Sequence, residues 1–229
     1  MTLPLRWLFF GASSNDDGYR RDRRRPRPVV IAEQNTAIGH DGWNDDPDHA
    51  ALASMRAGDV VAFESLFHRY YTRLVRAAYG YVRARDVAEE VVQDLMFRLW
   101  TRRGDMQVTG SVAVYLFTAV RHESMKRVRR AAIEQRWTSR EAAALASDER
   151  DVEIAPDATA ERRELHDAIG RAMASLPERC REVFRLYREQ DLRAPEIAQI
   201  LGITPSTVRV QLARAVRALR TQLAEYRRR

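Results

Sequence analysis

The stretch GITPSTVRVQLARAVRALR, near the carboxyl end, constrains the fold of this chain more than any other. It begins with Gly202, which can leave a helix with a positive φ at little cost, and continues with Thr204, a good cap for the next helix. Pro205 suits the first position of that helix. Ala198 is small enough to let two helices cross closely, and the spacing directs Val208 back toward the core. This pattern predicts a helix-turn-helix.

The helix after the turn is expected to be apolar on one face and polar on the other. The expected core face carries Val208, Leu212, Ala215, Val216, Leu219 and Leu223. The opposite face and its flanks carry Ser206, Thr207, Arg209, Val210, Gln211, Arg214, Arg217 and Thr221. Arginine can bind guanine edges or phosphates, and valine can contact a thymine methyl group, so this face suits the major groove of duplex DNA. The alternative is a solvated, arginine-rich helix in an ordinary bundle.

Helical periodicity also dominates upstream, from residue 47 onward, with no convincing strand alternation. Apolar residues recur at steps of three and four within residues 59–82, and a second helix is expected over 86–101. A third helix is expected from its N-cap Ser111 to about residue 130. The sequence therefore predicts an all-α fold.

The distribution of charge and of turn-forming residues divides the chain into four parts. Residues 1–50, which are rich in arginine and proline and then in acidic residues, are expected to form a disordered tail. Residues 51–131 and 162–226 are expected to form two small helical domains. Residues 132–161 are dominated by acidic and small side chains and are expected to be a flexible linker.

The amino-acid composition favours some classes of function and argues against others. The formal net charge of +7 and a pI near 10.0 favour a polyanionic partner, nucleic acid first. One cysteine excludes a disulfide within the chain and a cysteine-rich zinc site. The five histidines have no metal-ligand spacing, and there is no nucleophile motif or phosphate-binding glycine loop, so we expect no catalytic residues, no metal and no cofactor. No apolar run reaches the length of a membrane span, so we expect a soluble cytoplasmic protein without membrane insertion.

Two neighbouring predicted helices differ in charge. The helix over 86–101 exposes an acidic and amide patch close to Trp100, made of Glu89, Glu90, Gln93 and Asp94. The next helix is basic in its second half, with Arg121, His122, Lys126, Arg127, Arg129 and Arg130. An acidic patch repels DNA, so its partner, if it has one, should be a protein. An ordinary solvated helix face is the alternative interpretation.

Two blocks of the sequence resemble the bacterial sigma-70 family of RNA polymerase factors. The segments AFESLFHRYYTRLVRAAYGYV, DVAEEVVQDLMFRLW and SVAVYLFTAVRHESMKRVRR are similar to region two of that family. The segment LPERCREVFRLYREQDLRAPEIAQILGITPSTVRVQLARAVRALR is similar to region four. Their order and the short linker between them resemble the minimal, extracytoplasmic-function (ECF) group. The resemblance covers residues 51 to 220.

The resemblance implies a sigma factor that binds core RNA polymerase, at its clamp helices and flap, and directs promoter recognition, promoter melting and initiation. It implies that the minus-thirty-five element is bound as duplex by Ser206, Thr207, Arg209, Val210, Gln211 and Arg214. It implies that the minus-ten element is bound as melted single strand by Arg121, His122, Lys126 and Arg129. Glu90, Gln93 and Asp94 would then contact the clamp helices.

By the same resemblance, the loop over residues 105–109 would hold a flipped base, and the acidic linker would lead toward the RNA path of the polymerase. An anti-sigma factor is a further candidate partner. The competing hypothesis is an autonomous helix-turn-helix regulator, which binds operators without polymerase. Such a regulator would account for residues 202–220 but has no use for the acidic face over 86–101.

Overall fold

The computed structural model describes residues 47–108, 110–138 and 160–226. Most of the predicted tail and of the predicted linker, together with Thr109 of the loop over 105–109, lies outside these described residues. Within them the secondary structure is helical, with no strand, as the sequence predicts.

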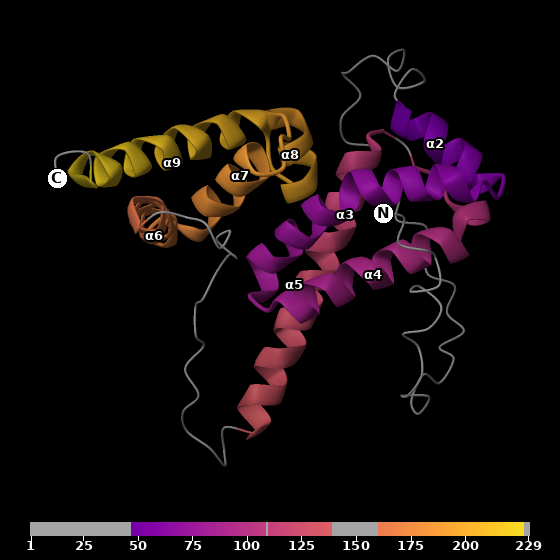
Figure 1. Ribbon diagram of the computed structural model, residues 1–229, viewed down its shortest axis with the longest axis horizontal. Coiled ribbons are helices and arrows are strands. Elements are labelled where there is room, and N and C mark those ends of the chain that lie inside the picture. Colours follow the sequence, from indigo (N-terminus) through magenta and orange to yellow (C-terminus); the bar gives the residue numbers. More distant parts are fainter. Residues whose placement is uncertain (1–46, 109, 139–159, 227–229) are drawn as a thin grey trace.

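An N-terminal unit is built from four α-helices and one short 3₁₀ turn. These elements are α2 (Pro47–Arg56), α3 (Val60–Val82), α4 (Arg85–Thr101), η2 (Arg103–Asp105) and α5 (Val112–Thr138). Helices α3, α4 and α5 pack on one another, and α2 covers the beginning of α3 (Figure 1). Their mutual burial provides most of the stability that short helices lack in isolation.

Capping side chains define where α3 and α5 begin. The Asp59 carboxylate accepts hydrogen bonds from the backbone N–H groups of Val61 and Ala62, at 2.9 and 3.2 Å. The Ser111 hydroxyl accepts one from Val114 N at 3.3 Å, which confirms the predicted N-cap of α5. The predicted stripe of α3 is buried at Phe63, Leu66, Tyr70, Leu74 and Ala78.

A C-terminal unit contains the predicted helix-turn-helix. Its elements are α6 (Ala160–Ala174), α7 (Glu178–Arg188), α8 (Ala194–Leu201) and α9 (Pro205–Tyr226). Gly202 has a φ of 64° between α8 and α9, and Ala198 and Val208 are buried at 4% and 0% exposure. The sequence reasoning about the turn and its two packing residues is therefore confirmed.

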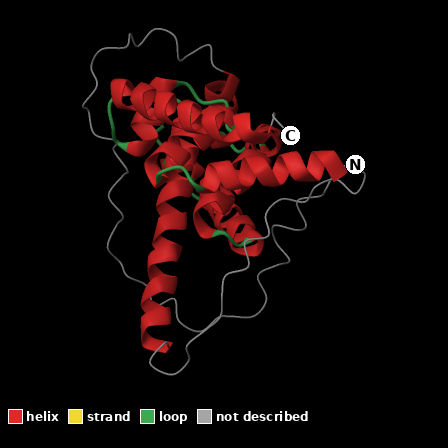
Figure 2. Cartoon of the chain, turned by 90° about the vertical axis from the view of Figure 1, so that its left-hand side faces the viewer, coloured by secondary structure: helices red, strands yellow, loops and turns green. Residues whose placement is uncertain are grey.

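The two units pack against each other rather than standing apart. Helix α8 contacts α5, and α7 contacts α3, so that residues of both units share one hydrophobic cluster. The C-terminal end of α5 extends away from both units (Figures 1 and 2). This helix continues to Thr138, past the end near residue 130 that the sequence predicts. Periodicity does not reveal the continuation, because residues 129–134 are exposed and form no apolar stripe.

Candidate nucleic-acid interface

The first half of α9 is held in place by its cap and by α8. Thr204 Oγ1 accepts a hydrogen bond from Thr207 N at 3.2 Å, and Thr204 O accepts one from Val208 N at 3.1 Å. Val208 is fully buried against the neighbouring helices. The beginning of α9 is therefore rigidly oriented, which a helix that reads a groove requires.

The predicted DNA-binding residues of α9 divide into two groups. Ser206, Arg209, Val210 and Arg214 are exposed, and 49% of Val210 is accessible to solvent. Thr207 and Gln211 are half-buried and bonded within the protein. The hydroxyl groups of Thr207 and Thr204 lie 2.8 Å apart, and Gln211 Oε1 accepts a hydrogen bond from the thiol of Cys180 at 2.8 Å. Cys180 is a buried core residue, as expected from the sequence.

Helix α5 brings its four predicted nucleic-acid residues to one hollow of about 430 Å³. The residues that line this hollow are Arg121, His122, Met125, Lys126 and Arg129. Met125 was not predicted, although its position four residues after Arg121 places it on the same helix face. Three of the lining side chains are cationic and Met125 is apolar and flexible, so the hollow combines charges for phosphates with a surface for a base.

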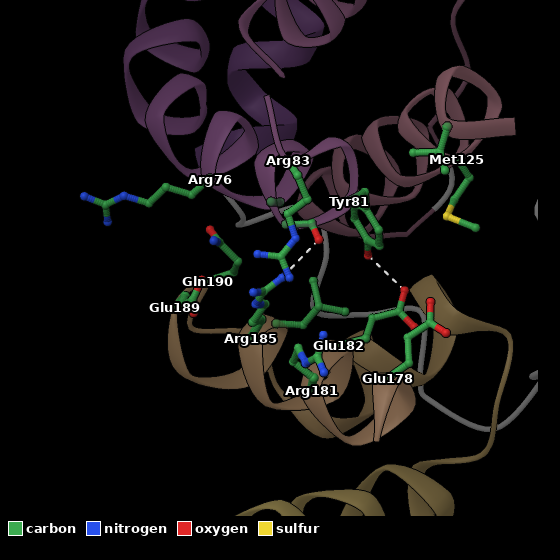
Figure 3. A pocket seen from close by; sticks show the side chains of 14 residues that line it. Arg76, Tyr81, Arg83, Met125, Glu178, Arg181, Glu182, Arg185, Glu189 and Gln190 are labelled. Carbon is green, nitrogen blue, oxygen red and sulfur yellow. Dashed lines mark hydrogen bonds between the residues drawn. The ribbon is translucent and has the colours of Figure 1, made fainter. Parts of the chain in front are cut away.

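Arg121 differs from the other residues of the hollow because the C-terminal unit binds it. Its Nε atom donates a hydrogen bond to Glu182 Oε1 on α7 at 2.9 Å, and only 18% of its side chain is exposed. Burial alone would lower the pKa of Arg121, but the hydrogen bond and charge of Glu182 raise it instead. Burial, together with the charge of Glu182, also raises the pKa of Tyr81, whose hydroxyl donates to the same carboxylate (Figure 3).

The predicted acidic face of α4 is exposed at Glu90, Gln93 and Asp94. Arg127 of α5 reaches across to this face and donates to Glu90 at 2.6 Å and to Asp94 at 2.9 Å. The hydrogen bond to Glu90 is the largest cause that raises the pKa of Arg127, against partial burial. The sequence placed Arg127 with the basic residues of α5. The structure adds that a step of one residue from Lys126 turns Arg127 toward α4.

An exposed aromatic side chain on α4 was missed by sequence reasoning. Phe97 is 48% exposed and lies one helical turn after Gln93, on the same face as the acidic patch. Trp100, in contrast, is half-buried, with its ring 5.2 Å from that of Phe63 and the Arg103 guanidinium 4.3 Å from its ring centroid. The sequence did contain an indication that Phe97 is exposed, because Phe97 lies outside the predicted apolar stripe of α4.

In the loop over 105–108, Asp105 and Gln107 are exposed, whereas Met106 and Val108 pack on the hydrophobic cluster.

Among residues 47–108, 110–138 and 160–226, no cluster of histidine, cysteine and acidic side chains could bind a metal ion. No helix within these ranges is both long and apolar enough to cross a membrane.

Comparison with known proteins identifies both units. Residues 66–133 match the family described as Sigma-70 region 2, and residues 166–219 match Sigma-70, region 4. The ECF RNA polymerase sigma factor SigM of Mycobacterium tuberculosis is 30% identical over 179 residues, which cover 78% of this chain and 86% of that protein. The chain belongs to the ECF RNA polymerase sigma factors. SigW of Bacillus subtilis, another member, is 21% identical over 178 residues, 76% of this sigma factor and 95% of that one.

Two solved structures have the same fold as this sigma factor. CnrH, in complex with the cytosolic domain of CnrY, gives a TM-score of 0.55 at 21% identity, over 79% of this chain and 99% of CnrH. The sigma factor RpoE of Bartonella quintana, in complex with the anti-sigma factor NepR, gives 0.57 at 19% identity, over 72% of this chain and 98% of RpoE. The N-terminal unit holds the region-two match and the C-terminal unit holds the region-four match.

Proposed function

We propose that this sigma factor binds core RNA polymerase and directs it to promoters, where it takes part in promoter recognition, melting and initiation. The observation that carries the proposal is the hollow on α5, where the four residues implied for the minus-ten element come together with Met125. Membership in the sigma family supports the same conclusion. The polymerase performs the chemistry, and the sigma factor contributes no catalytic group.

In this proposal α9 reads the minus-thirty-five element as duplex. Arg209, Val210 and Arg214 are exposed toward the groove, and Ser206 is exposed beside them with its hydroxyl 2.8 Å from that of the cap residue Thr204. Thr207 and Gln211 serve mainly to hold α9 on its own unit, since both are bonded within the protein. Arginine provides both base recognition and phosphate binding, so it carries most of the affinity.

The hollow of α5 binds the melted minus-ten strand. Its cations, Arg121, Lys126 and Arg129, neutralise phosphates, and Met125 and His122 offer surfaces against which an unpaired base can pack. Holding an unpaired base lowers the free energy of the melted state relative to the duplex, which favours promoter opening.

Helix α4 supplies the contact with the polymerase clamp helices. Glu90, Gln93 and Asp94 form its polar part, and Phe97 supplies an exposed aromatic group beside them. Aromatic residues at the centre of an interface commonly account for much of its affinity. Arg127 orders the two carboxylates before binding, which reduces the entropy cost of the contact.

Two further properties belong to the proposal. The site of action is the cytoplasm, where bacterial RNA polymerase works. The solved relatives CnrH and RpoE were captured with protein partners, the latter an anti-sigma factor, and we extend this to the present chain as a regulatory partner of the same class.

The test is run-off transcription with purified core polymerase on a genomic library, followed by mapping of the start sites. The proposal expects initiation at a discrete set of sites that share two sequence elements, and none with core polymerase alone. Transcription that does not depend on the added protein would contradict it.

A further inference from the structure

The two units meet along an interface that the proposed function does not explain. Val183 and Leu186 of α7 belong to the same buried cluster as Leu74 of α3 and Phe117 of α5. A pocket of about 360 Å³ adjoins this cluster at Leu186 and is lined by residues of α3, α5 and α7 (Figure 3). The interface therefore combines an apolar cluster with a pocket that holds several charged side chains.

Two backbone carbonyl groups are bound across this interface by arginines. Arg185 Nη1 of α7 donates to the carbonyl of Gly80 on α3 at 3.0 Å, and Figure 3 shows this bond. Arg73 of α3 donates to the carbonyl of Gln190, just after α7. These bonds fix the relative position of α3 and α7, since each joins a guanidinium of one unit to the backbone of the other.

Glu182 of α7 is the central polar group of the interface. Its Oε1 atom accepts hydrogen bonds from Arg121 Nε at 2.9 Å and from the Tyr81 hydroxyl at 3.0 Å, and its Oε2 atom accepts one from Arg179 at 3.1 Å. Only 13% of the Glu182 side chain is exposed. A carboxylate so far removed from water depends on its cationic partner, so the bond to Arg121 is a fixed contact rather than a surface ion pair.

We infer that Glu182 competes with promoter DNA for Arg121, so that the C-terminal unit closes the minus-ten site while the chain is free. A carboxylate oxygen offers a guanidinium N–H the same charge and the same kind of acceptor as a phosphate oxygen. The single N–H of Arg121 Nε is bonded to Glu182, and because only 18% of the side chain is exposed, its other N–H groups are largely closed to a phosphate. The inference rests on the proposed function, because it takes the hollow of α5 to be the site of the melted strand.

The closed form leaves part of the hollow available. His122, Lys126 and Arg129 are exposed, so nucleic acid can still be attracted, but without Arg121. Besides the clamp helices, which α4 is proposed to contact, the family resemblance implies a contact at the flap of the polymerase, and this inference assigns that second contact to the C-terminal unit. Binding of polymerase therefore separates the units and releases Arg121 for DNA.

The first test measures binding of the full chain, without polymerase, to a short fluorescein-labelled single-stranded DNA of mixed sequence by fluorescence anisotropy. Glu182→Ala should bind this DNA about tenfold more tightly than wild type. A tenfold change in affinity is expected when one charge-assisted hydrogen bond no longer competes with DNA for Arg121. The logarithmic salt slope of Glu182→Ala should be steeper by about 0.7, for one additional phosphate contact on a single strand.

The matched control is Glu178→Ala, which removes the same charge one turn earlier on α7, from an exposed position. It should stay within about twofold of wild type, because an exposed charge is screened by solvent. An affinity of Glu182→Ala equal to that of wild type, or to that of Glu178→Ala, would overturn the inference.

The second test measures the closed form itself, by small-angle X-ray scattering of the full chain. Glu182→Arg places a cation against Arg121 and should increase the radius of gyration. Combining Glu182→Arg with Arg121→Glu restores opposite charges and should return the radius to the wild-type value. A Glu182→Arg chain as compact as wild type, or a charge exchange that stays expanded, would contradict the inference.

Transcription separates this inference from the proposed function. With core polymerase, Glu182→Ala should initiate at the same sites as wild type and at least as strongly. If wild type itself fails to initiate with polymerase, the proposed function is wrong, and the scattering experiment still decides whether Glu182 holds the two units together.

Discussion

The two nucleic-acid faces of this sigma factor differ in how available they are. On α9, Arg209 and Arg214 lie exposed on a helix whose other side packs into its own unit. On α5, Arg121 lies on the interface between the units and is bound by Glu182 at 2.9 Å. Helical spacing gathers the residues of each face on one side of a helix, but the packing of the two units decides which face is accessible to DNA. The same residue type can therefore be ready to bind DNA in one place and withheld in another.

The first prediction concerns the packing that positions the α5 face. Phe117, on the buried face of α5, is 2% exposed, with the Arg73 guanidinium 5.5 Å from its ring. Phe117→Ala should lower the free energy of unfolding by about 3–5 kcal/mol, through lost burial and an internal cavity. Chemical denaturation followed by circular dichroism measures it. Val210→Ala on the exposed α9 face is the control, with a change within about 0.5 kcal/mol. A Phe117→Ala chain as stable as wild type would show that α5 is not held by this packing.

The second prediction concerns the partner that opens the closed face. Gln93→Ala combined with Asp94→Ala should weaken binding to core polymerase by about 2 kcal/mol or more, as expected for central interface residues. Phe97→Ala should weaken it by a comparable amount. The measurement is equilibrium binding to labelled core polymerase, with Gln199→Ala, an exposed amide on α8, as control. If the α4 variants fold and bind core polymerase as tightly as wild type, the proposal that α4 contacts the polymerase is wrong.

The third prediction separates two arginines on the open face. Arg214→Ala should cost about 1–3 kcal/mol and relax preference at one position of the minus-thirty-five element, because Arg214 can reach a base edge. Arg217→Ala, one turn further from the cap, should lower transcription from all promoters alike and flatten the salt slope by about one. In vitro transcription from a library randomised over that element checks both. Unchanged preference in Arg214→Ala would mean that the docking depth of α9 is wrong.

The smallest effect is expected at Gln211, on the flank of the same helix. Its amide oxygen accepts the thiol hydrogen bond of Cys180, so it is directed toward α7 rather than toward DNA. Gln211→Ala should change the minus-thirty-five preference less than Arg214→Ala and cost under about 1 kcal/mol of stability. The same promoter library measures the preference. A shift as large as that of Arg214→Ala would indicate that Gln211 turns outward to read a base.

The local spacing of apolar and turn-forming residues in the sequence was sufficient to predict most of the fold. The spacing of Phe63, Leu66, Tyr70 and Leu74 placed α3, and the positions of Gly202 and Val208 placed the helix-turn-helix. Each depends on contacts within one helix or between adjacent helices, where periodicity carries the information. The four nucleic-acid residues of α5 came together for the same reason, because they lie on successive turns of one helix.

Contacts between distant segments could not be predicted in this way. Arg121 and Glu182 are separated by 61 residues, and nothing near either residue indicates the other. The contacts of Arg127 could not be predicted either, because its partners, Glu90 and Asp94, lie on another helix. Gln211 was expected to face DNA, and only the position of Cys180 on α7 shows how its amide is used. In each case tertiary packing selects one partner from several that local sequence allows.

Whether promoter binding depends on polymerase tests the account most directly. The measurement is a gel shift of a mapped duplex promoter at physiological salt, with the full chain alone, with core polymerase alone and with both. We predict a sequence-specific complex only when both are present, because one small helix-turn-helix makes few base contacts and the minus-ten face is closed in the free chain. A chain that by itself selects one duplex sequence with about nanomolar affinity would contradict the account and favour an autonomous regulator.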